Sequence, residues 1–471
     1  MSDAFPKTIE KAHSALIKKE ISCEELTRHY LDVISERDGR IHAFLEVFDD
    51  ASIQHAKRVD EKIVRDGGLG MLEGIPIAVK DNILIEGTRT TAASRILANY
   101  SASYDAHVIR LLKSAGSIFL GKTNMDEFAM GSSCENSAFG PTRNPYDETR
   151  VPGGSSGGST AAVAAGECLA ALGSDTGGSI RQPAAFCGVV GLKPTYGAVS
   201  RSGLIAMASS LDQVGPIANT VGDTELLFYA IRGKDAQDST SVETKKRKKT
   251  GGLVIGIPKE YFGGGIGSGE RKVIEDALAL ISNSGVTMKN ISLPHTDYAL
   301  SCYYIIVPAE VSANLSRYDG IRYGFTKEAG TLFETYVQSR SYGLGSEARR
   351  RTMIGAYVLS SGYYDAYYLQ AQKVRTLVRQ DFEKAFEEVD VILSLTTPQV
   401  AFKIGEKTKD PLTMYLQDVY TCPVNLAGLP AMSVPCGFVD GLPVGLQIIG
   451  RSFDEETIFE LGKKYEILRD G

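Results

Sequence analysis

The sequence predicts an α/β fold in which helices cover both faces of a central β-sheet. Short apolar segments typical of buried strands alternate with segments of helical periodicity along most of the 471 residues. Residues 75–79 (IPIAV) and 391–395 (VILSL) are two such strands. Many of the 49 glycines lie between residues 131 and 203, which indicates tight main-chain turns in that part of the chain.

The first segment, residues 7–65, has a helical pattern. Ser22 resembles an N-cap with acidic residues after it, and Leu26, Tyr30 and Ile34 share one helical face. The elements expected after it are a strand ending before Lys80, helix 105–115, strand 117–121, helix 159–166, strand 168–173, strand 253–257, helix 270–284, long helices within 346–388, strand 391–395 and a Gly/Pro-rich stretch at 423–449.

The charge balance is mild. The formal net charge is −6, which excludes a nucleic-acid surface over the whole chain but not a local basic patch. The one obvious patch is residues 245–249 (KKRKK), which fits either nucleic-acid binding or a solvated loop between two lobes. We favour the loop.

Cysteine usage argues against metal and disulfide frameworks. The seven cysteines are scattered, with no CxxC pair and no Cys/His cluster, so we expect neither a zinc site nor a disulfide framework. The N-terminus lacks a signal-peptide pattern, and no apolar run approaches the roughly 20 residues needed to cross a bilayer. We therefore expect a reducing, cytoplasmic location and no membrane partner.

Two Gly/Ser clusters stand out, at residues 153–159 (GGSSGGS) and 175–181 (DTGGSIR). The first lacks the Gly-Lys-Ser/Thr ending of a phosphate-binding loop, and neither is a GxGxxG dinucleotide motif. A flexible linker is a poor explanation, because dense apolar helix and strand patterns bracket both clusters.

The second cluster suits an oxyanion hole. The N–H groups of Thr176, Gly177, Gly178 and Ser179 can converge on one point because bulky side chains are absent. Ser179 then stands where a nucleophile is expected, but a serine hydroxyl needs a base.

Lysine is the main candidate for that base. Of the six histidines only His107 lies in the glycine-rich half, on an ordinary helix. Lys80 ends an apolar strand, which could remove water from its amine and lower its pKa toward neutrality. A solvated strand end is the other interpretation of Lys80.

These blocks resemble the amidase signature family. The match consists of Lys80 in GIPIAVKDN, Ser155 in PGGSSGGS and Ser179 in SDTGGSIRQPA, at intervals of 155 − 80 = 75 and 179 − 155 = 24 residues. The segments 191–205 (GLKPTYGAVSRSGLI) and 210–216 (SLDQVGP) also resemble the family. Three ordered blocks at this spacing make the resemblance very specific.

The resemblance implies a central mixed sheet wrapped by helices. It also implies a continuous domain over residues 66–471, with a catalytic core at about 70–220 and residues 1–65 as a helical segment packed on it. Ser179 would attack the amide, Ser155 would relay the proton and neutral Lys80 would accept it, with no metal, and the Gly154–Ser155 peptide would be cis. Supporting roles fall to further residues. Asp81 and Asn82 would support the catalytic residues without contacting the substrate. Ser156, Asp175 and Arg181 would hold the glycine-rich loops together.

Within the family, further segments resemble the glutamine-hydrolysing subunits of tRNA-dependent amidotransferases. They are residues 122–145, 316–324, 360–382 and 422–437. The resemblance implies that the chain hydrolyses glutamine, needs no cofactor of its own and passes ammonia to a B-type kinase/transamidase subunit, which uses ATP and Mg²⁺. That partner would contact the tRNA and amidate Glu-tRNA(Gln), Asp-tRNA(Asn) or both, and a small C-type subunit would complete the complex. A stand-alone amidase acting on another small amide is the alternative.

Glutamine carries an α-carboxylate and an α-ammonium, so its pocket should offer one cation and one anion. Arg351 and Asp418 align with positions that do this in the subgroup, although Arg350 is possible in place of Arg351, and either residue could instead form a surface ion pair. The remaining pocket residues expected from the resemblance are Gly131, Ser132, Tyr303 and Tyr304. In one departure from the subgroup, Cys134 stands where a threonine is expected.

Overall fold

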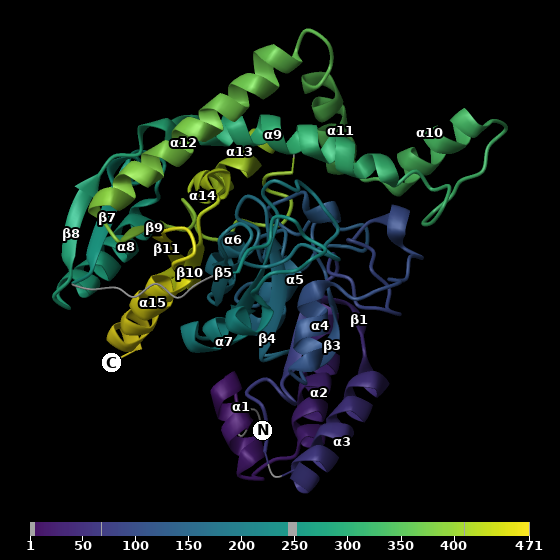
Figure 1. Ribbon diagram of the computed structural model, residues 1–471, viewed down its shortest axis with the longest axis vertical. Coiled ribbons are helices and arrows are strands. Elements are labelled where there is room, and N and C mark those ends of the chain that lie inside the picture. The colour runs from purple at the N-terminus through teal and green to yellow at the C-terminus, as the bar shows by residue number, and fades with distance from the viewer. Residues whose placement is uncertain (1–4, 67, 244–251, 409, 471) are drawn as a thin grey trace.

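In the computed structural model, residues 5–66, 68–243, 252–408 and 410–470 are described (Figure 1). The basic run at 245–249 lies outside them. Eleven strands of these residues form one sheet in the order β1-β3-β2-β4-β6-β5-β10-β11-β9-β7-β8. The strands are β1 (Phe44–Val47), β2 (Pro76–Lys80), β3 (Ile118–Thr123), β4 (Ala170–Asp175), β5 (Val190–Lys193), β6 (Gln213–Ala218), β7 (Val254–Pro258), β8 (Thr287–Ile291), β9 (Val391–Leu395), β10 (Ala431–Val439) and β11 (Leu442–Gly450).

The sheet is mixed, which confirms the predicted fold class. β2 pairs in parallel with β3 and β4, and β7 pairs in parallel with β8 and β9. The other named pairs are antiparallel. The strands predicted near residues 75, 117, 168, 253 and 391 are all present within two residues of the expected bounds.

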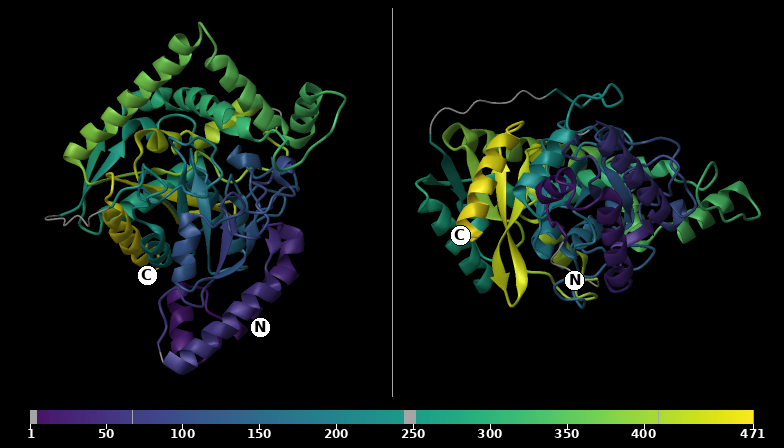
Figure 2. Two further views of the ribbon diagram at one scale, coloured as in Figure 1. Left: turned by 45° about the vertical axis from the view of Figure 1, so that its right-hand side comes forward. Right: turned by 90° about the horizontal axis from the view of Figure 1, so that it is seen from below.

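Helices flank this sheet. α5 and α6 pack on each other and on the central strands, while α4, α7 and α15 form another contacting group. α1–α3 lie at one end of the molecule and α9, α11 and α12 at the other, and α10 stands away from the sheet in both Figures 1 and 2. The helices are α1 (Ile9–Ile17), α2 (Cys23–Ile41), α3 (Asp49–Asp66), α4 (His107–Ser114), α5 (Gly157–Ala164), α6 (Arg181–Cys187), α7 (Val221–Ile231), α8 (Ser268–Ser282), α9 (Ala299–Asn314), α10 (Leu332–Gly343), α11 (Ser346–Val358), α12 (Leu369–Glu388), α13 (Pro411–Tyr415), α14 (Cys422–Ala427) and α15 (Glu455–Asp470).

The N-terminal segment is helical with one exception. Ser22 and Glu25 form the capping box that starts α2, as the sequence predicted. Residues 44–47, which were expected to be helical, instead form the edge strand β1 beside β3. His42 adopts a left-handed conformation that ends α2, so the chain leaves the helix and pairs with the sheet.

The Gly/Pro-rich stretch near the end of the chain is a hairpin in the middle of the sheet. β10 and β11 are joined at Asp440 and Gly441, which have φ values of 51° and 79°. Such an Asp-Gly pair favours a tight hairpin turn. Pro435 is tolerated because the β10–β11 register shifts beside it.

The parallel pairing of β2 with β4 positions the site. Parallel neighbours end at the same edge of a sheet, so Lys80, at the end of β2, lies near the end of β4, where its Nζ is 2.9 Å from Ser174 Oγ. The glycine-rich loop after β4 therefore begins next to Lys80. Within the parts of the chain described here, no helix is long and apolar enough to cross a membrane.

Candidate active site

Lys80 is fully buried and surrounded by hydroxyl groups. Its Nζ lies 2.8 Å from Ser155 Oγ and 2.9 Å from Ser156 Oγ. The same nitrogen lies 2.9 Å from Ser174 Oγ. Burial lowers the pKa of Lys80 to about 7, against the opposing influence of Asp126 and other charges. A lysine with this pKa is largely neutral just above pH 7 and can accept a proton, so it is not a solvated strand end.

The hydrogen bonds around Lys80 exclude Ser156 as the hydroxyl that gives it a proton, whereas Ser155 can do so. Ser156 Oγ donates to the carbonyl of Ser174 at 3.0 Å and accepts from the Ser174 N–H at 3.2 Å. Its proton is therefore committed, and it accepts from Lys80. The Ser155 hydroxyl has no such competing acceptor among the described residues, so its proton can point at the lone pair of a neutral Lys80.

Ser155 and Ser179 lie on adjoining loops. The Gly154–Ser155 peptide bond is cis, as the resemblance implied. The next amide, Ser156 N–H, donates to Ser179 O at 3.0 Å, which ties the two loops together. Lys80 and Ser155 are completely buried, whereas Ser179 is 8% exposed. Ser179 is thus the member of this group that a substrate can reach first.

The expected oxyanion hole needs one correction. Gly178 N–H donates to Asp175 Oδ1 at 2.9 Å, so this amide is already occupied. The N–H groups of Thr176, Gly177 and Ser179 meet no acceptor among the described residues. These three are the better donors. A side chain at Gly177 would come within 2.5 Å of the Tyr303 ring, which explains the glycine there.

Asp175 and Arg181 hold this loop, as expected. Arg181 donates to Asp175 through Nε and Nη2, both at 3.1 Å, and both side chains are fully buried. Burial alone would raise the pKa of Asp175, but Arg181 lowers it to about 2. The buried pair therefore stays charged and fixes the loop that carries Ser179.

Arg351 lies in a second cluster over the same loop. It is 3% exposed, and its Nε donates to Glu347 Oε1 at 2.8 Å. Its guanidinium carbon lies 5.2 Å from the centre of the Tyr304 ring and 5.6 Å from that of Tyr415. Arg350 binds the other carboxylate oxygen of Glu347, but 43% of its side chain is exposed. Arg351, not Arg350, is the buried cation of this cluster.

Asp418 is the matching anion. It is buried, accepts a hydrogen bond from the Ser132 hydroxyl, and has Oδ1 3.4 Å from the point where a side chain at Gly178 would begin. Burial raises the pKa of Asp418 to about 7, although Ser132 and Arg351 act in the opposite direction. Gly131 precedes Ser132, and a side chain there would collide with the Asp126 carboxylate.

Comparison with known proteins agrees with this geometry. A family model described as Amidase matches residues 25–459. The chain belongs to the amidase family. The A-type subunit of the glutamyl-tRNA(Gln) amidotransferase of Geobacillus thermodenitrificans is 55% identical over 474 residues, covering 99% of this chain and 98% of that protein.

Solved structures of amidases share the fold over the whole chain. The A-type subunit of the glutamyl-tRNA(Gln) amidotransferase of Thermotoga maritima superposes with a TM-score of 0.80 at 44% identity, covering 98% of this chain and 94% of that one. The peptide amidase of Stenotrophomonas maltophilia superposes with a TM-score of 0.80 at 29% identity, covering 100% and 98%.

The expected supporting residues of this amidase differ in position. Asn82 Nδ2 donates to Ser174 Oγ at 2.9 Å and so supports the surroundings of Lys80. Asp81 turns away: it accepts from Thr91 N at 2.9 Å and lies 3.5 Å from Lys122 Nζ. The expectation that Asp81 supports the site was therefore wrong, because successive residues at a strand end point in opposite directions.

Two polar residues that sequence reasoning missed hold the site together. Asp126 accepts from the N–H groups of Cys134 at 2.9 Å and Asn136 at 3.1 Å, and it is the carboxylate with the largest effect on Lys80. Gln182 accepts from Gly154 N at 2.9 Å and donates to Ser132 O at 2.8 Å. The position of Asp126, three residues after the end of β3, was the one available signal.

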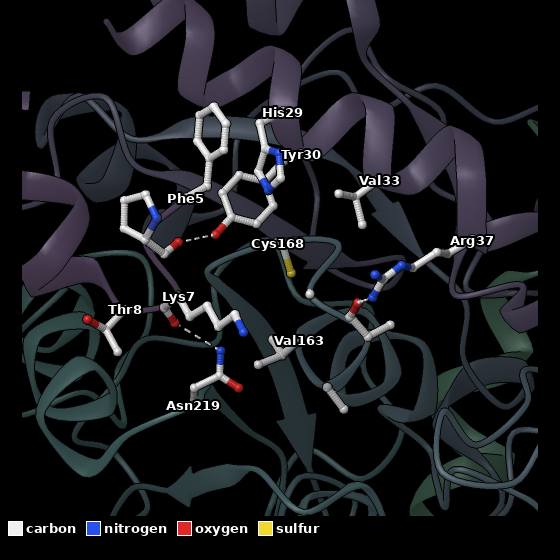
Figure 3. Close-up of a pocket in the computed structure, with 14 residues that line it drawn as sticks. Phe5, Lys7, Thr8, His29, Tyr30, Val33, Arg37, Val163, Cys168 and Asn219 are labelled. Carbon is white, nitrogen blue, oxygen red and sulfur yellow. Dashed lines mark hydrogen bonds between the residues drawn. The ribbon is translucent and has the colours of Figure 1, made fainter. Parts of the chain in front are cut away.

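A separate cavity of about 410 Å³ lies elsewhere in the amidase (Figure 3). Residues lining it include Phe5, Tyr30, Arg37 and Cys168, and none of the predicted site residues lies in its wall. Cys168 precedes β4, whereas the Ser179 loop follows it, so the cavity lies at the opposite end of that strand. In residues 5–66, 68–243, 252–408 and 410–470, no group of His, Cys, Asp and Glu is arranged to hold a metal ion.

Proposed function

We propose that this chain is the amidase subunit of a glutamyl-tRNA(Gln) amidotransferase and that it hydrolyses glutamine. The contact between buried Lys80 and Ser155 carries the proposal, because it places a base with a pKa of about 7 against a hydroxyl beside the Ser179 loop. Near-full-length similarity to A-type subunits of that enzyme supports the same assignment.

The proposed reaction moves a proton from Ser179 to Lys80 and then back to the leaving nitrogen. Ser179 Oγ attacks the side-chain carbonyl carbon of glutamine while its proton passes to Ser155, and the Ser155 proton passes to neutral Lys80. The amide N–H groups of Thr176, Gly177 and Ser179 stabilise the oxyanion. The proton then returns through Ser155 to the leaving nitrogen, the C–N bond breaks and ammonia departs. Water attacks the ester on Ser179 by the same route and releases glutamate.

The charged cluster supports glutamine as the substrate. Arg351 keeps Nη1 and Nη2 available for the α-carboxylate, since its Nε is the nitrogen bound to Glu347. Asp418 would bind the α-ammonium, with Ser132 orienting its carboxylate. Tyr303 and Tyr304 complete the wall of the pocket.

The remaining assignments belong to the same proposal. The ammonia would pass to a B-type kinase/transamidase subunit that holds ATP and Mg²⁺ and contacts the tRNA, with a small C-type subunit in the complex. This chain would itself need no cofactor and would work in the cytoplasm. The acceptor would be Glu-tRNA(Gln), Asp-tRNA(Asn) or both.

Ser179→Ala tests the proposal. The variant complex should lose glutamine-dependent amidation of Glu-tRNA(Gln) but keep amidation with ammonium chloride, because the partner uses ammonia directly. The measurement is the amount of charged Gln-tRNA formed with each nitrogen donor. Loss of both activities would indicate a structural role for Ser179, and faster turnover of unrelated amides than of glutamine by the wild-type chain would favour a stand-alone amidase.

A further inference from the structure

We propose that Glu127 is a positioning residue for glutamine: it fixes the amino end of α11 against the catalytic core and so determines where Arg351 meets the substrate carboxylate. The inference rests on the proposed function, since it concerns the same pocket. Glu127 is 2% exposed and directly follows Asp126 in the sequence, in a short helical turn over Glu127–Ala129.

Both carboxylate oxygens of Glu127 are used to hold the turn between α10 and α11. Oε2 accepts from Gly345 N–H at 2.8 Å. Oε1 accepts from the Ser94 hydroxyl, whose oxygen lies 3.2 Å from Gly343 O. A carboxylate at this place also satisfies one of the free N–H groups at the start of a helix and complements its dipole.

The α10–α11 turn has glycines at the two positions where a side chain would collide with the core. Gly345 immediately precedes α11, and a side chain there would collide with Glu127 Oε2. A side chain at Gly343 would come within 2.6 Å of Ile96. Leu344 between them is buried, with 4% exposure. The α10–α11 turn is therefore seated in the core at one defined position.

Because α11 joins this turn to Arg351, the position of the turn affects the position of Arg351. Arg351 is six residues after Gly345, about 9 Å along the axis at the usual helical rise. Glu347, in the first turn, binds Arg351 Nε and accepts from Tyr415 OH at 3.0 Å. Farther along, Gly355 is in direct contact with Pro308 of α9. A shift at the amino end of α11 therefore moves the guanidinium relative to the Ser179 loop.

The same short segment, residues 126–132, also positions Asp418, the anion of the proposed pocket. Asp126 accepts from the N–H groups of Ser133 and Cys134, and the neighbouring Ser132 donates to Asp418. Residues 126–132 thus contact the supports of both the cation and the anion. The distance between Arg351 and Asp418 must match the fixed separation of the two charged groups on the α-carbon of glutamine. Glu127 sets the position of Arg351.

The test is a double-mutant cycle in the assembled complex. Glu127→Ala should raise KM for glutamine about tenfold while kcat changes less than about twofold, because binding and not proton transfer is affected. Glu127→Gln keeps an acceptor for Gly345 N–H and should recover much of the affinity. In an Arg351→Met background, adding Glu127→Ala should cause no further loss of kcat/KM.

Glu270→Ala is the matched control. Glu270 is also buried and accepts a backbone N–H, from Val400 at 3.0 Å, but it contacts none of the pocket residues. This variant should leave KM unchanged. The inference is overturned if Glu127→Ala lowers kcat at constant KM, or costs as much in the Arg351→Met background as alone. In either case the proposed function stands as long as the wild-type complex hydrolyses glutamine and Ser179→Ala does not.

Discussion

The proposed catalytic side chains and the side chains around Arg351 occupy adjoining but differently built regions. Lys80, Ser155 and Ser179 come from strand ends and glycine-rich loops in the middle of the sheet. Arg351 and Tyr304 come from α11 and α9, in the helical layer above it (Figure 1).

The outer faces of the two regions also differ. α11 carries Met353, with 73% exposure, and Tyr357, with 51%, whereas α5 and α6 are buried almost throughout. The chemistry therefore sits in a part of the molecule shielded from its surroundings. The proposed substrate recognition, by contrast, depends on α11, whose outer face is exposed.

Lys80→Met should have the largest effect, and it should impair catalysis without impairing glutamine binding. Without a base beside Ser155, kcat for glutamine should fall about 10³-fold or more. Glutamine binding should persist because Arg351 is untouched. Ammonia release measures the first effect and isothermal calorimetry the second. Unchanged ester formation on Ser179 in this variant would contradict the proposed proton route.

Arg351→Met should impair glutamine binding without impairing the proton transfers. Removing the cation should lower kcat/KM for glutamine about 10²-fold, chiefly through KM. The rate with 4-aminobutyramide, which lacks the carboxylate, should remain that of the wild type. Arg350→Met is the matched control: Arg350 binds the same Glu347 but has 43% of its side chain exposed, so its loss should change both rates much less than the loss of Arg351.

A pH profile should separate the two regions. Lys80 acts when neutral, so kcat/KM should fall about tenfold per pH unit as pH drops below its pKa of about 7. In the proposed pocket Asp418 binds the α-ammonium when ionised, and its pKa is also about 7, so glutamine should show a steeper fall than one proton explains. Glutaramate, which lacks the amine, should show a shallower fall than glutamine. Identical slopes for both substrates would exclude Asp418 as the ammonium ligand.

Cys134→Thr should have the smallest effect. The thiol is fully buried, and burial raises its pKa to about 12, so it is unreactive at neutral pH. Replacing it with the threonine expected from the resemblance should change kcat by less than about twofold. Iodoacetamide should likewise leave the wild-type activity intact; rapid inactivation that Cys134→Thr prevents would contradict this.

The sequence predicted the catalytic region better than the rest because its residues are marked locally. Gly/Ser clusters and a strand that ends in lysine can be recognised within ten residues. The mistake at Gly178 arose because the carboxylate of Asp175 takes its N–H, a competition that glycine content does not reveal. The different roles of Asp81 and Asn82 could be distinguished only once the direction of each side chain at the strand end was known.

The recognition region depends on contacts between distant parts of the chain. Glu127 and Gly345 are 218 residues apart, and Ser132 and Asp418 are 286 apart, so no local pattern reports either contact. The choice between Arg350 and Arg351 turns on which face of α11 is buried. Spacing alone does not decide, because Glu347 pairs with both Arg350 and Arg351, three and four residues away; only Arg351 is buried.

The edge strand β1 has a practical consequence for any shortened version of this protein. Residues 44–47 cover the free edge of β3, with Phe44 opposite Thr123 and Val47 opposite Gly121. Removal of the first 48 residues would expose the backbone groups of β3, which invites pairing with other molecules and precipitation. A fusion point in the loop before Ile9 keeps that cover in place.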